Sequence, residues 1–179
     1  MKKFLRIISN IYHHIHCRKS PYDYAKGLGV KLGENVNFYG LKPGQFGAEP
    51  WLIEIGNNVY ITAGCQFITH DGGTLILRKE VPDLELCDQI KIGNDVYIGM
   101  NTMICPGVVI GDRVIIGAGS IVTKSIPSNS VAVGSPARVI KTVDEYLEKA
   151  KINSIKLGNL YGKEKEIALK KHFNVFNDN

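Results

Sequence analysis

The chain has 179 residues, about the length of one domain, and its 19 glycines and 44% hydrophobic residues favour a turn-rich β fold over a disordered chain. Its net charge of +5 is unevenly distributed. Residues 32–137 carry six basic against ten acidic side chains, whereas residues 1–31 carry seven against one and residues 138–179 carry nine against six. A nucleic-acid-binding protein would need a basic stripe along its body. The charge distribution therefore argues against nucleic acid as a partner.

The N-terminal segment has the pattern of an amphipathic helix. Residues 4–16 place apolar side chains at helical spacing behind a basic start. We expect residues 1–28 to form a cap, because terminal elements must cover the open end of a repeat stack. A basic helix lying on a membrane surface is the less favoured alternative.

The sequence also predicts a compartment. It contains no signal-peptide pattern and no apolar run approaching the roughly 20 residues of a membrane span. Its four cysteines follow no metal-ligand spacing. We therefore expect a cytoplasmic protein with reduced thiols.

A six-residue period runs through the middle of the chain. Six consecutive windows begin with an aliphatic residue, and glycine follows it in four of them. The aliphatic positions are Ile92, Ile98, Ile104, Ile110, Ile116 and Val122. A helix repeats every 3.6 residues and a strand every 2, whereas the hexapeptide β-helix repeats every six. The period predicts an all-β solenoid, a left-handed parallel β-helix, with these side chains pointing inward.

Two segments interrupt this period. The Pro- and Gly-rich stretch Gly40–Trp51 bends the chain, and Gly73–Gln89 lacks the glycine pattern and is predicted to leave the solenoid as an excursion loop after His70. The repeats amount to about 3.5–4 coils within residues 29–141. Polar pairs that tolerate left-handed backbone are expected at the coil corners. They occupy positions 57–58, 94–95 and 112–113.

Helices are predicted after the repeat. Thr142 and Glu145 fit a capping box that opens one helix, and a second helix is predicted over Lys163–His172. We expect residues 142–179 to form a helical tail. The complete prediction is a β-solenoid flanked by N- and C-terminal α-helices.

His70 is the one histidine inside the predicted solenoid. It occupies the fourth position of its hexad, away from the inward aliphatic position and directly before the excursion loop. An outward imidazole beside a long loop is suited to act as a general base near pH 7. A surface histidine without function fits the sequence equally well.

Four motifs follow one another in the second half of the chain: Ile-Gly-Asn-Asp-Val-Tyr-Ile-Gly (92–99), Pro-Gly-Val-Val-Ile-Gly-Asp (106–112), Gly-Ala-Gly-Ser-Ile-Val-Thr-Lys (117–124) and Gly-Ser-Pro-Ala-Arg-Val-Ile (134–140). Together they resemble the hexapeptide-repeat, left-handed β-helix acetyltransferases that use acetyl-CoA. The closest resemblance is to sugar and polysaccharide-cluster O-acetyltransferases and to the galactoside and maltose acetyltransferase group. Phe46-Gly-x-Glu-Pro-Trp and Ile68-Thr-His-Asp-Gly-Gly resemble the polysaccharide-cluster branch.

The resemblance implies a homotrimer with active sites between subunits. His70 matches the family's catalytic histidine and would take the proton from an acceptor hydroxyl as its oxygen attacks acetyl-CoA. The implied reaction is O-acetylation of a saccharide or polysaccharide precursor, with a saccharide or nucleotide-sugar acceptor and without a metal. Glu49, Trp51 and Asp71 are the candidates to line the acceptor pocket.

The resemblance also implies the donor-binding positions. Small residues would leave room for the pantetheine arm, and cationic residues would suit the phosphates of coenzyme A. The matching positions are Met100, Gly117, Ala118, Thr123, Lys124, Arg138 and Lys141. Two of them depart from the family pattern, because Met100 stands where a serine is common and Lys141 where an arginine is common.

Other functions remain to be weighed. A zinc hydratase built on the same solenoid would need three histidine ligands, which a solenoid holding only His70 does not supply. N-acetylation of a nucleotide-linked amino sugar and a non-catalytic β-solenoid scaffold both stay open as alternatives.

Overall fold

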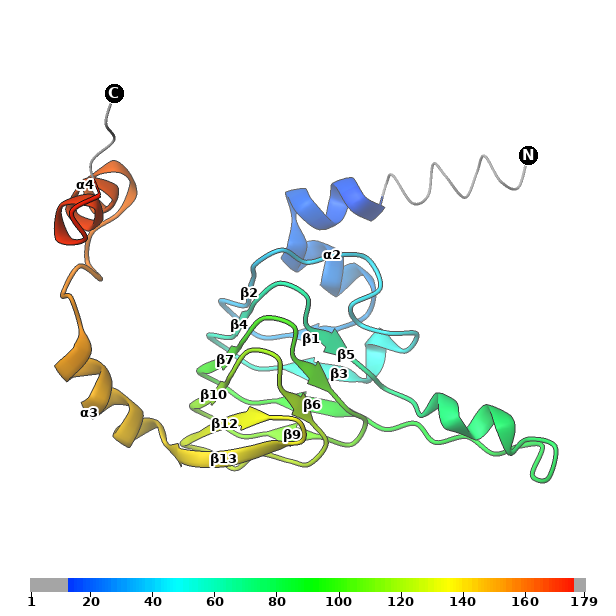
Figure 1. Cartoon of the computed structure of the whole chain (residues 1–179). Helices are drawn as coiled ribbons and strands as arrows, with labels where there is room; N and C mark the ends of the chain where they lie inside the picture. The colour runs from blue at the N-terminus through cyan, green and yellow to red at the C-terminus, as the bar shows by residue number, and fades with distance from the viewer. Residues whose placement is uncertain (1–12, 176–179) are drawn as a thin grey trace. The chain divides into compact units, whose positions relative to one another are not determined.

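The computed structural model describes residues 13–175 of the chain (Figure 1). The chain divides into two compact units, with the boundary after Val143. The second unit contains all but the first residue of α3 (Val143–Asn153) and the whole of α4 (Gly162–His172), and neither helix buries any residue. No helix within the described range is long and apolar enough to cross a membrane.

The first unit begins with helical structure. Residues 13–19 are helical, and α2 (Pro21–Gly27) follows. Residues 4–12 of the predicted amphipathic helix lie outside the described part of the chain. Helix α2 buries Tyr24 and Ala25 and packs against the first two strands of the solenoid.

Short strands form three sheets, here called A, B and C. Sheet A contains β1 (Lys31–Leu32), β3 (Ile53–Ile55), β6 (Ile90–Ile92) and β9 (Val109–Ile110). Sheet B contains β2 (Asn37–Phe38), β4 (Tyr60–Ile61), β7 (Val96–Ile98), β10 (Val114–Ile116), β12 (Ser130–Gly134) and β13 (Ala137–Thr142). Sheet C contains β5 (Gln66–Phe67), β8 (Met103–Ile104) and β11 (Ile121–Val122).

The chain visits the three sheets in turn, so the strands form a parallel β-helix (Figure 1). Strands β6, β7 and β8 lie in sheets A, B and C, and β9, β10 and β11 repeat the order beside them. Lys91 pairs with Val109 and Met103 with Ile121, each 18 residues later, which is three hexads. One hexad therefore supplies one side of the coil. Among the strands of residues 13–175, every pair is parallel except β12–β13, an antiparallel pair at the end of sheet B.

The predicted inward positions form the core. All six aliphatic residues that begin the hexads from Ile92 to Val122 are at most 3% exposed. They stack on their equivalents in neighbouring coils, because parallel pairing in register aligns Ile98 with Ile116 and Ile104 with Val122. Burial of these aliphatic columns supplies the main hydrophobic stabilisation of the solenoid.

The corners between sheets A and B are built by the polar pairs, as predicted. Asn58, Asp95 and Arg113 take left-handed backbone, with φ of 54°, 55° and 55°. The preceding residue of each pair stabilises the stack, because the side chain of Asn94 accepts a hydrogen bond from the Asn57 backbone at 2.9 Å and that of Asp112 accepts one from the Asn94 backbone at 2.6 Å.

The excursion leaves the solenoid where sheet C turns toward sheet A, and it extends away from the stacked coils (Figure 1). Short 3₁₀ helix η2 (Gly72–Ile76) opens it. Its base is closed by an antiparallel bridge between His70 and Cys87 and by a hydrogen bond from the Asp88 amide to the Thr69 carbonyl at 2.9 Å. The two ends of the excursion therefore hold His70 in place.

Candidate active site

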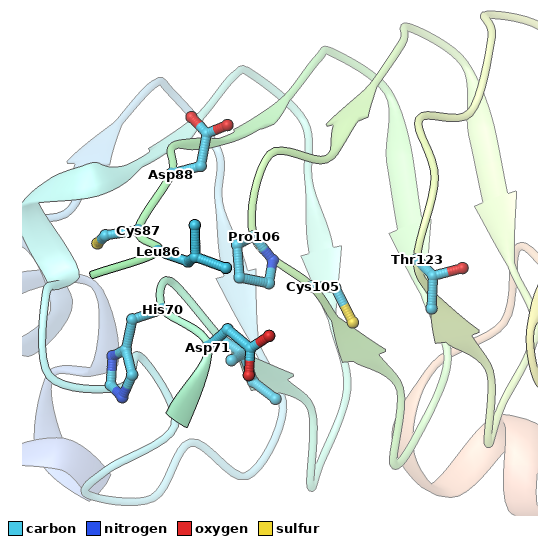
Figure 2. Close-up of a pocket in the computed structure, with 9 residues that line it drawn as sticks. His70, Asp71, Leu86, Cys87, Asp88, Cys105, Pro106 and Thr123 are labelled. Carbon is cyan, nitrogen blue, oxygen red and sulfur yellow. The ribbon is translucent and has the colours of Figure 1, made fainter. Parts of the chain in front are cut away.

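A column of residues marks the corner that follows sheet C. Ile68, Cys105 and Thr123 come directly after β5, β8 and β11, whose register aligns Phe67 with Ile104 and Ile104 with Val122. Figure 2 shows Cys105 and Thr123 on successive coils, with His70 beyond them beside Leu86 and Cys87 of the excursion. The solenoid thus provides a rigid wall that ends at His70.

His70 is paired with Glu49. The Nδ1 atom of the imidazole lies 2.8 Å from Glu49 Oε2, and the two side chains are 38% and 26% exposed. An ionised carboxylate can only accept a hydrogen bond, so Nδ1 carries the proton in the neutral imidazole. The lone pair is then on Nε2. This is the tautomer that a general base needs if the substrate is to approach Nε2.

The segment Gly40–Trp51 places Glu49 beside His70. Its Gln45 carbonyl accepts a hydrogen bond from the Phe67 amide at 2.8 Å, so the segment lies along the outer edge of β5. Phe46 is 2% exposed and stacks on Phe67 with ring centroids 5.3 Å apart. Gly47 then turns the chain with φ of 64°, a conformation that side chains other than glycine disfavour.

Thr69 completes the arrangement. It is fully buried, and its hydroxyl donates a hydrogen bond to Glu49 Oε2 at 2.6 Å. The hydrogen bonds from Thr69 and then from His70 lower the pKa of Glu49. The hydrogen bond and charge of Glu49 in turn raise the pKa of His70. Both shifts favour a charged pair when the imidazole takes up a proton.

Two cavities meet at His70. The coil cavity, about 600 Å³, runs along the column from His70 to Thr123. The loop cavity, about 410 Å³, lies between His70 and the excursion. His70, Asp71 and Cys87 line both cavities. An imidazole shared by two cavities is placed to move a proton between two bound molecules.

The cysteines near the site are poor nucleophiles. Cys87 and Cys105 line the coil cavity, and desolvation is the largest cause that raises the pKa of each thiol. The negative charges of Glu49 and Glu85 raise the pKa of Cys87 further. Because the thiolate is the reactive form, neither thiol is activated for covalent catalysis.

The expected donor-binding residues are divided between two corners. Thr123 lines the coil cavity, and exposed Lys124 follows it at the same corner. Met100, Gly117 and Ala118 lie at the corner between sheets B and C, where the Gly119 amide donates a hydrogen bond to the Met100 carbonyl at 2.7 Å. The strands of sheet C separate these two corners. Met100, Gly117 and Ala118 therefore line neither of the cavities beside His70 in the same chain.

Arg138 and Lys141, the other expected donor-binding residues, lie on β13 at the end of sheet B. Arg138 is exposed and its guanidinium donates to the Ala137 carbonyl at 2.9 Å, while Lys141 is half-buried. Both residues are remote from the excursion in the sheet order, and neither lines a cavity that contains His70.

The corner between sheets B and C requires a small residue at Gly99. A Cβ atom there would lie 2.8 Å from Ala118 Cα and would also overlap the Ala118 backbone nitrogen. The two coils therefore approach closely at this point, which leaves the backbone around exposed Ala118 unobstructed.

The expected acceptor residues have different positions. Asp71 lines both cavities, and its side chain accepts a hydrogen bond from the Gly73 amide at 2.8 Å. Glu49 lines the loop cavity and also contacts His70, a pairing that sequence reasoning missed. Trp51 is 59% exposed and lines neither cavity.

Sequence reasoning also missed Thr69, and it gave no role to Arg78, Glu85 and Cys87 of the loop cavity. Thr69 stands within the Ile-Thr-His-Asp motif, so its place next to the histidine was the available signal. The excursion residues gave no such signal in the sequence, because their spacing has no period.

Across residues 13–175, no group of three or more His, Cys, Asp or Glu side chains is arranged to hold a metal ion.

Comparison with known proteins identifies relatives. Residues 89–124 match the family described as bacterial transferase hexapeptide (six repeats). Protein CapG of Staphylococcus aureus is 44% identical over 157 residues, which cover 88% of this chain and 90% of that protein. A protein of S. aureus strain COL named "Putative acetyltransferase SACOL2570" is 38% identical over 124 residues, which cover 58% of this chain and 61% of that protein.

Among solved structures, a maltose O-acetyltransferase from Clostridium difficile 630 is 28% identical, with a TM-score of 0.46 over 74% of this chain and 87% of that chain. The family assignment rests on the sequence relatives, since CapG aligns over most of both chains.

Proposed function

The chain belongs to the hexapeptide-repeat acetyltransferases, and we propose that it transfers the acetyl group of acetyl-CoA to a sugar hydroxyl, with His70 as the general base. One observation carries this proposal: the Glu49-paired imidazole of His70 stands where two cavities meet. O-acetylation of a saccharide or polysaccharide precursor agrees with the sequence motifs around Glu49 and His70. A cytoplasmic location remains a prediction.

The reaction needs one proton carrier and two aligned substrates. His70 Nε2 takes the proton of the acceptor hydroxyl as its oxygen forms a bond to the thioester carbonyl carbon. The carbon–sulfur bond then breaks, and the proton passes from His70 to the sulfur of coenzyme A. Glu49 stabilises the imidazolium that exists between the two proton transfers. Alignment of the two substrates supplies much of the remaining rate enhancement.

The chain's residues fit acetyl-CoA as the donor. The coil cavity, at about 600 Å³, is large enough for the thioester end and leads along the solenoid wall to Thr123. Lys124 and Arg138 are exposed cations that can contact phosphate groups. Ala118 is small and exposed above Gly99, which suits close passage of the pantetheine arm.

We place each complete site between two subunits of a homotrimer. The Ala118 corner and the His70 corner lie on opposite sides of sheet C within one chain. Neighbouring solenoids packed around a threefold axis can bring the His70 corner of one chain against the Ala118 corner of the next. This arrangement would use all the donor-binding positions that the motifs imply.

The proposal is tested by an acetyl-CoA turnover screen over sugars and nucleotide sugars, corrected for thioester hydrolysis. His70→Ala should lower kcat by about 10²–10⁴-fold, the usual contribution of a general base. The exposed His172→Ala is the matched control and should retain full turnover. Unchanged turnover in His70→Ala would overturn the mechanism.

A binding measurement separates the enzyme from a scaffold. Acetyl-CoA at millimolar concentration should raise the melting temperature of both the parent protein and His70→Ala, because the base is not needed for donor binding. Absence of any shift in the parent protein would favour the non-catalytic scaffold. N-acetylation of an amino sugar would appear in the same screen as turnover confined to amine acceptors.

A further inference from the structure

The loop cavity has more charged side chains in its wall than the coil cavity, because Glu49, Asp71, Glu85 and Arg78 line it against Asp71 and Asp88 in the coil cavity. Glu49 and His70 line one part of the cavity, and residues between Asp71 and Cys87 line the other part. Its volume of about 410 Å³ lies in the range of small-molecule sites, about 300–1,000 Å³. Of the two cavities at His70, the coil cavity leads to the expected donor-binding position Thr123, so the loop cavity is the candidate for the acceptor.

Carboxylates dominate the charge of the loop cavity. Glu49, Asp71 and Glu85 line it against one lining cation, Arg78. Arg78 and Glu85 neutralise each other as an ion pair, and Arg78 also donates to the Leu84 carbonyl at 3.1 Å. Glu49 and Asp71 therefore supply the excess negative charge of the wall. The excursion Gly73–Gln89 has two basic and four acidic side chains, and Asp71 just before it adds a fifth carboxylate. A ligand that carries phosphate would meet repulsion here and no uncommitted lining cation.

The same wall suits a polyol. Ionised carboxylates are acceptors only, so they pair with hydroxyl groups, which donate. Leu75, which is 62% exposed, and Cys87 provide apolar surface beside them for the C–H face of a sugar ring. The exposed cations expected to serve coenzyme A, Lys124 and Arg138, line neither His70 cavity in the same chain. The cations expected to contact the phosphates of coenzyme A therefore lie outside the loop cavity of the same chain.

We propose that the loop cavity selects an uncharged glycan hydroxyl as acceptor and discriminates against sugars carried on a nucleoside diphosphate. This inference rests on the proposed function, because it takes His70 as the base that serves the bound hydroxyl. It goes further than that function in two ways. It assigns the acceptor to the loop cavity, and it excludes sugars carried on a nucleoside diphosphate because of their negative charge. Glu85 and Asp71 become specificity-determining residues.

The charge can be measured without any acetyl transfer. Cys87 is exposed and lines both cavities, so its labelling rate reports the electrostatic potential where they meet beside His70. The full-length protein is treated with a cationic trimethylammonium and an anionic sulfonate methanethiosulfonate reagent, each rate being divided by that for a small free thiol. Peptide mass spectrometry locates the label, and Cys87→Ser gives the background.

The cationic reagent should react at least about 10-fold faster after this correction, and the ratio should fall as added salt screens the carboxylates. A ratio of one or less would overturn the proposal. This readout is independent of catalysis, so it tests the negative potential on which the selection depends even if the protein acetylates no sugar in the screen. Absence of all turnover would count against the proposed function alone.

Matched acceptors test the same inference by activity. Each hexose and N-acetylhexosamine is offered as its methyl glycoside and as its uridine diphosphate conjugate. The neutral member should have a kcat/KM at least about 10-fold higher. Glu85→Gln, which removes a carboxylate and releases Arg78, should narrow this ratio, whereas Glu80→Gln, on the exposed part of the excursion, should leave it unchanged. Preference for the conjugates would overturn the assignment.

Discussion

His70 Nδ1 lies 2.8 Å from Glu49 Oε2, although the two residues are 21 positions apart and belong to different coils. The contact depends on the Gly40–Trp51 segment, which runs beside β5 and ends at η1 (Pro50–Leu52). In the proposed mechanism Glu49 is a positioning residue, because it fixes which imidazole nitrogen is free and stabilises the protonated ring.

Replacing Glu49 with glutamine should change both the rate and its pH dependence. The amide removes the charge and can donate to Nδ1, which favours the wrong tautomer, so kcat should fall by about 10²-fold or more. Glu49 raises the pKa of His70, and the base must be neutral to work. The rising limb of the kcat profile should therefore move to lower pH in the variant.

The control for this variant is Glu54→Gln, an exposed carboxylate on β3. It should leave both kcat and the pH profile unchanged. A Glu49→Gln enzyme with the parent's pH profile would show that the carboxylate does not act through His70.

The Glu49–His70 pair should also make stability depend on pH. His70 has a raised pKa, so its contribution is complete below its ordinary value of about 6.5 and is lost as the pH rises through the folded-state pKa. Glu49 has a lowered pKa, so its contribution is present above about 4.3 and is lost as the pH falls through its folded-state value.

The difference in melting temperature between the parent and Glu49→Gln should therefore be greatest between about pH 4.3 and 6.5. It should shrink at alkaline pH, where His70 is neutral and only the hydrogen bonds of Glu49 remain. A series of thermal melts from pH 4 to 9 provides the measurement. An equal deficit at pH 5.5 and pH 9 would mean that the variant loses packing rather than an ion pair.

Thr69→Val should separate the role of the hydroxyl from that of the buried side chain. The hydroxyl donates to Glu49 Oε2 at 2.6 Å, so its loss should cost about 1 kcal/mol of unfolding free energy and lower kcat. Urea denaturation and steady-state kinetics measure the two effects. Thr69→Ser keeps the donor and should recover most of the activity; equal kcat in both variants would contradict a positioning role.

Mixing two inactive proteins should restore activity if the site lies between subunits. His70→Ala and Ala118→Trp damage opposite corners of the solenoid. In a 1:1 mixture that is refolded or co-expressed as random trimers, about a quarter of the interfaces should combine an intact His70 from one chain with an intact Ala118 from the next. Turnover near that fraction of the parent's is expected, with mass measurement confirming assembly. If both residues serve one chain, the mixture would stay inactive.

Gly99→Ala should destabilise the solenoid at the corner between sheets B and C. The new methyl group would meet the backbone of Ala118, and forcing these coils apart should cost about 1–3 kcal/mol. Gly27→Ala is the control, because no atom lies within 4 Å of the position of its Cβ. Comparable chemical-denaturation curves for the two variants would show that the coils are not tightly stacked there.

The sequence by itself determined the scaffold. Its six-residue period predicts buried aliphatic side chains and turns with left-handed backbone. The structure shows the burial in the six aliphatic residues from Ile92 to Val122. It shows the left-handed backbone at Asn58, Asp95 and Arg113. These features are local and repetitive, so the residues of each hexad suffice to predict its buried position and its turn. The repeat placed His70 at the start of the excursion, and the resemblance of the surrounding motifs to the acetyltransferases selected it as the candidate base.

Only the tertiary structure decided how the site is assembled. Glu49 reaches His70 because an irregular segment packs Phe46 on Phe67, and no periodicity encodes that contact. The separation of Ala118 from His70 by sheet C, and the carboxylates that the excursion gathers around Arg78, likewise follow from coil order and loop path. Contacts between distant, non-repeating segments depend on packing, which residue spacing does not specify.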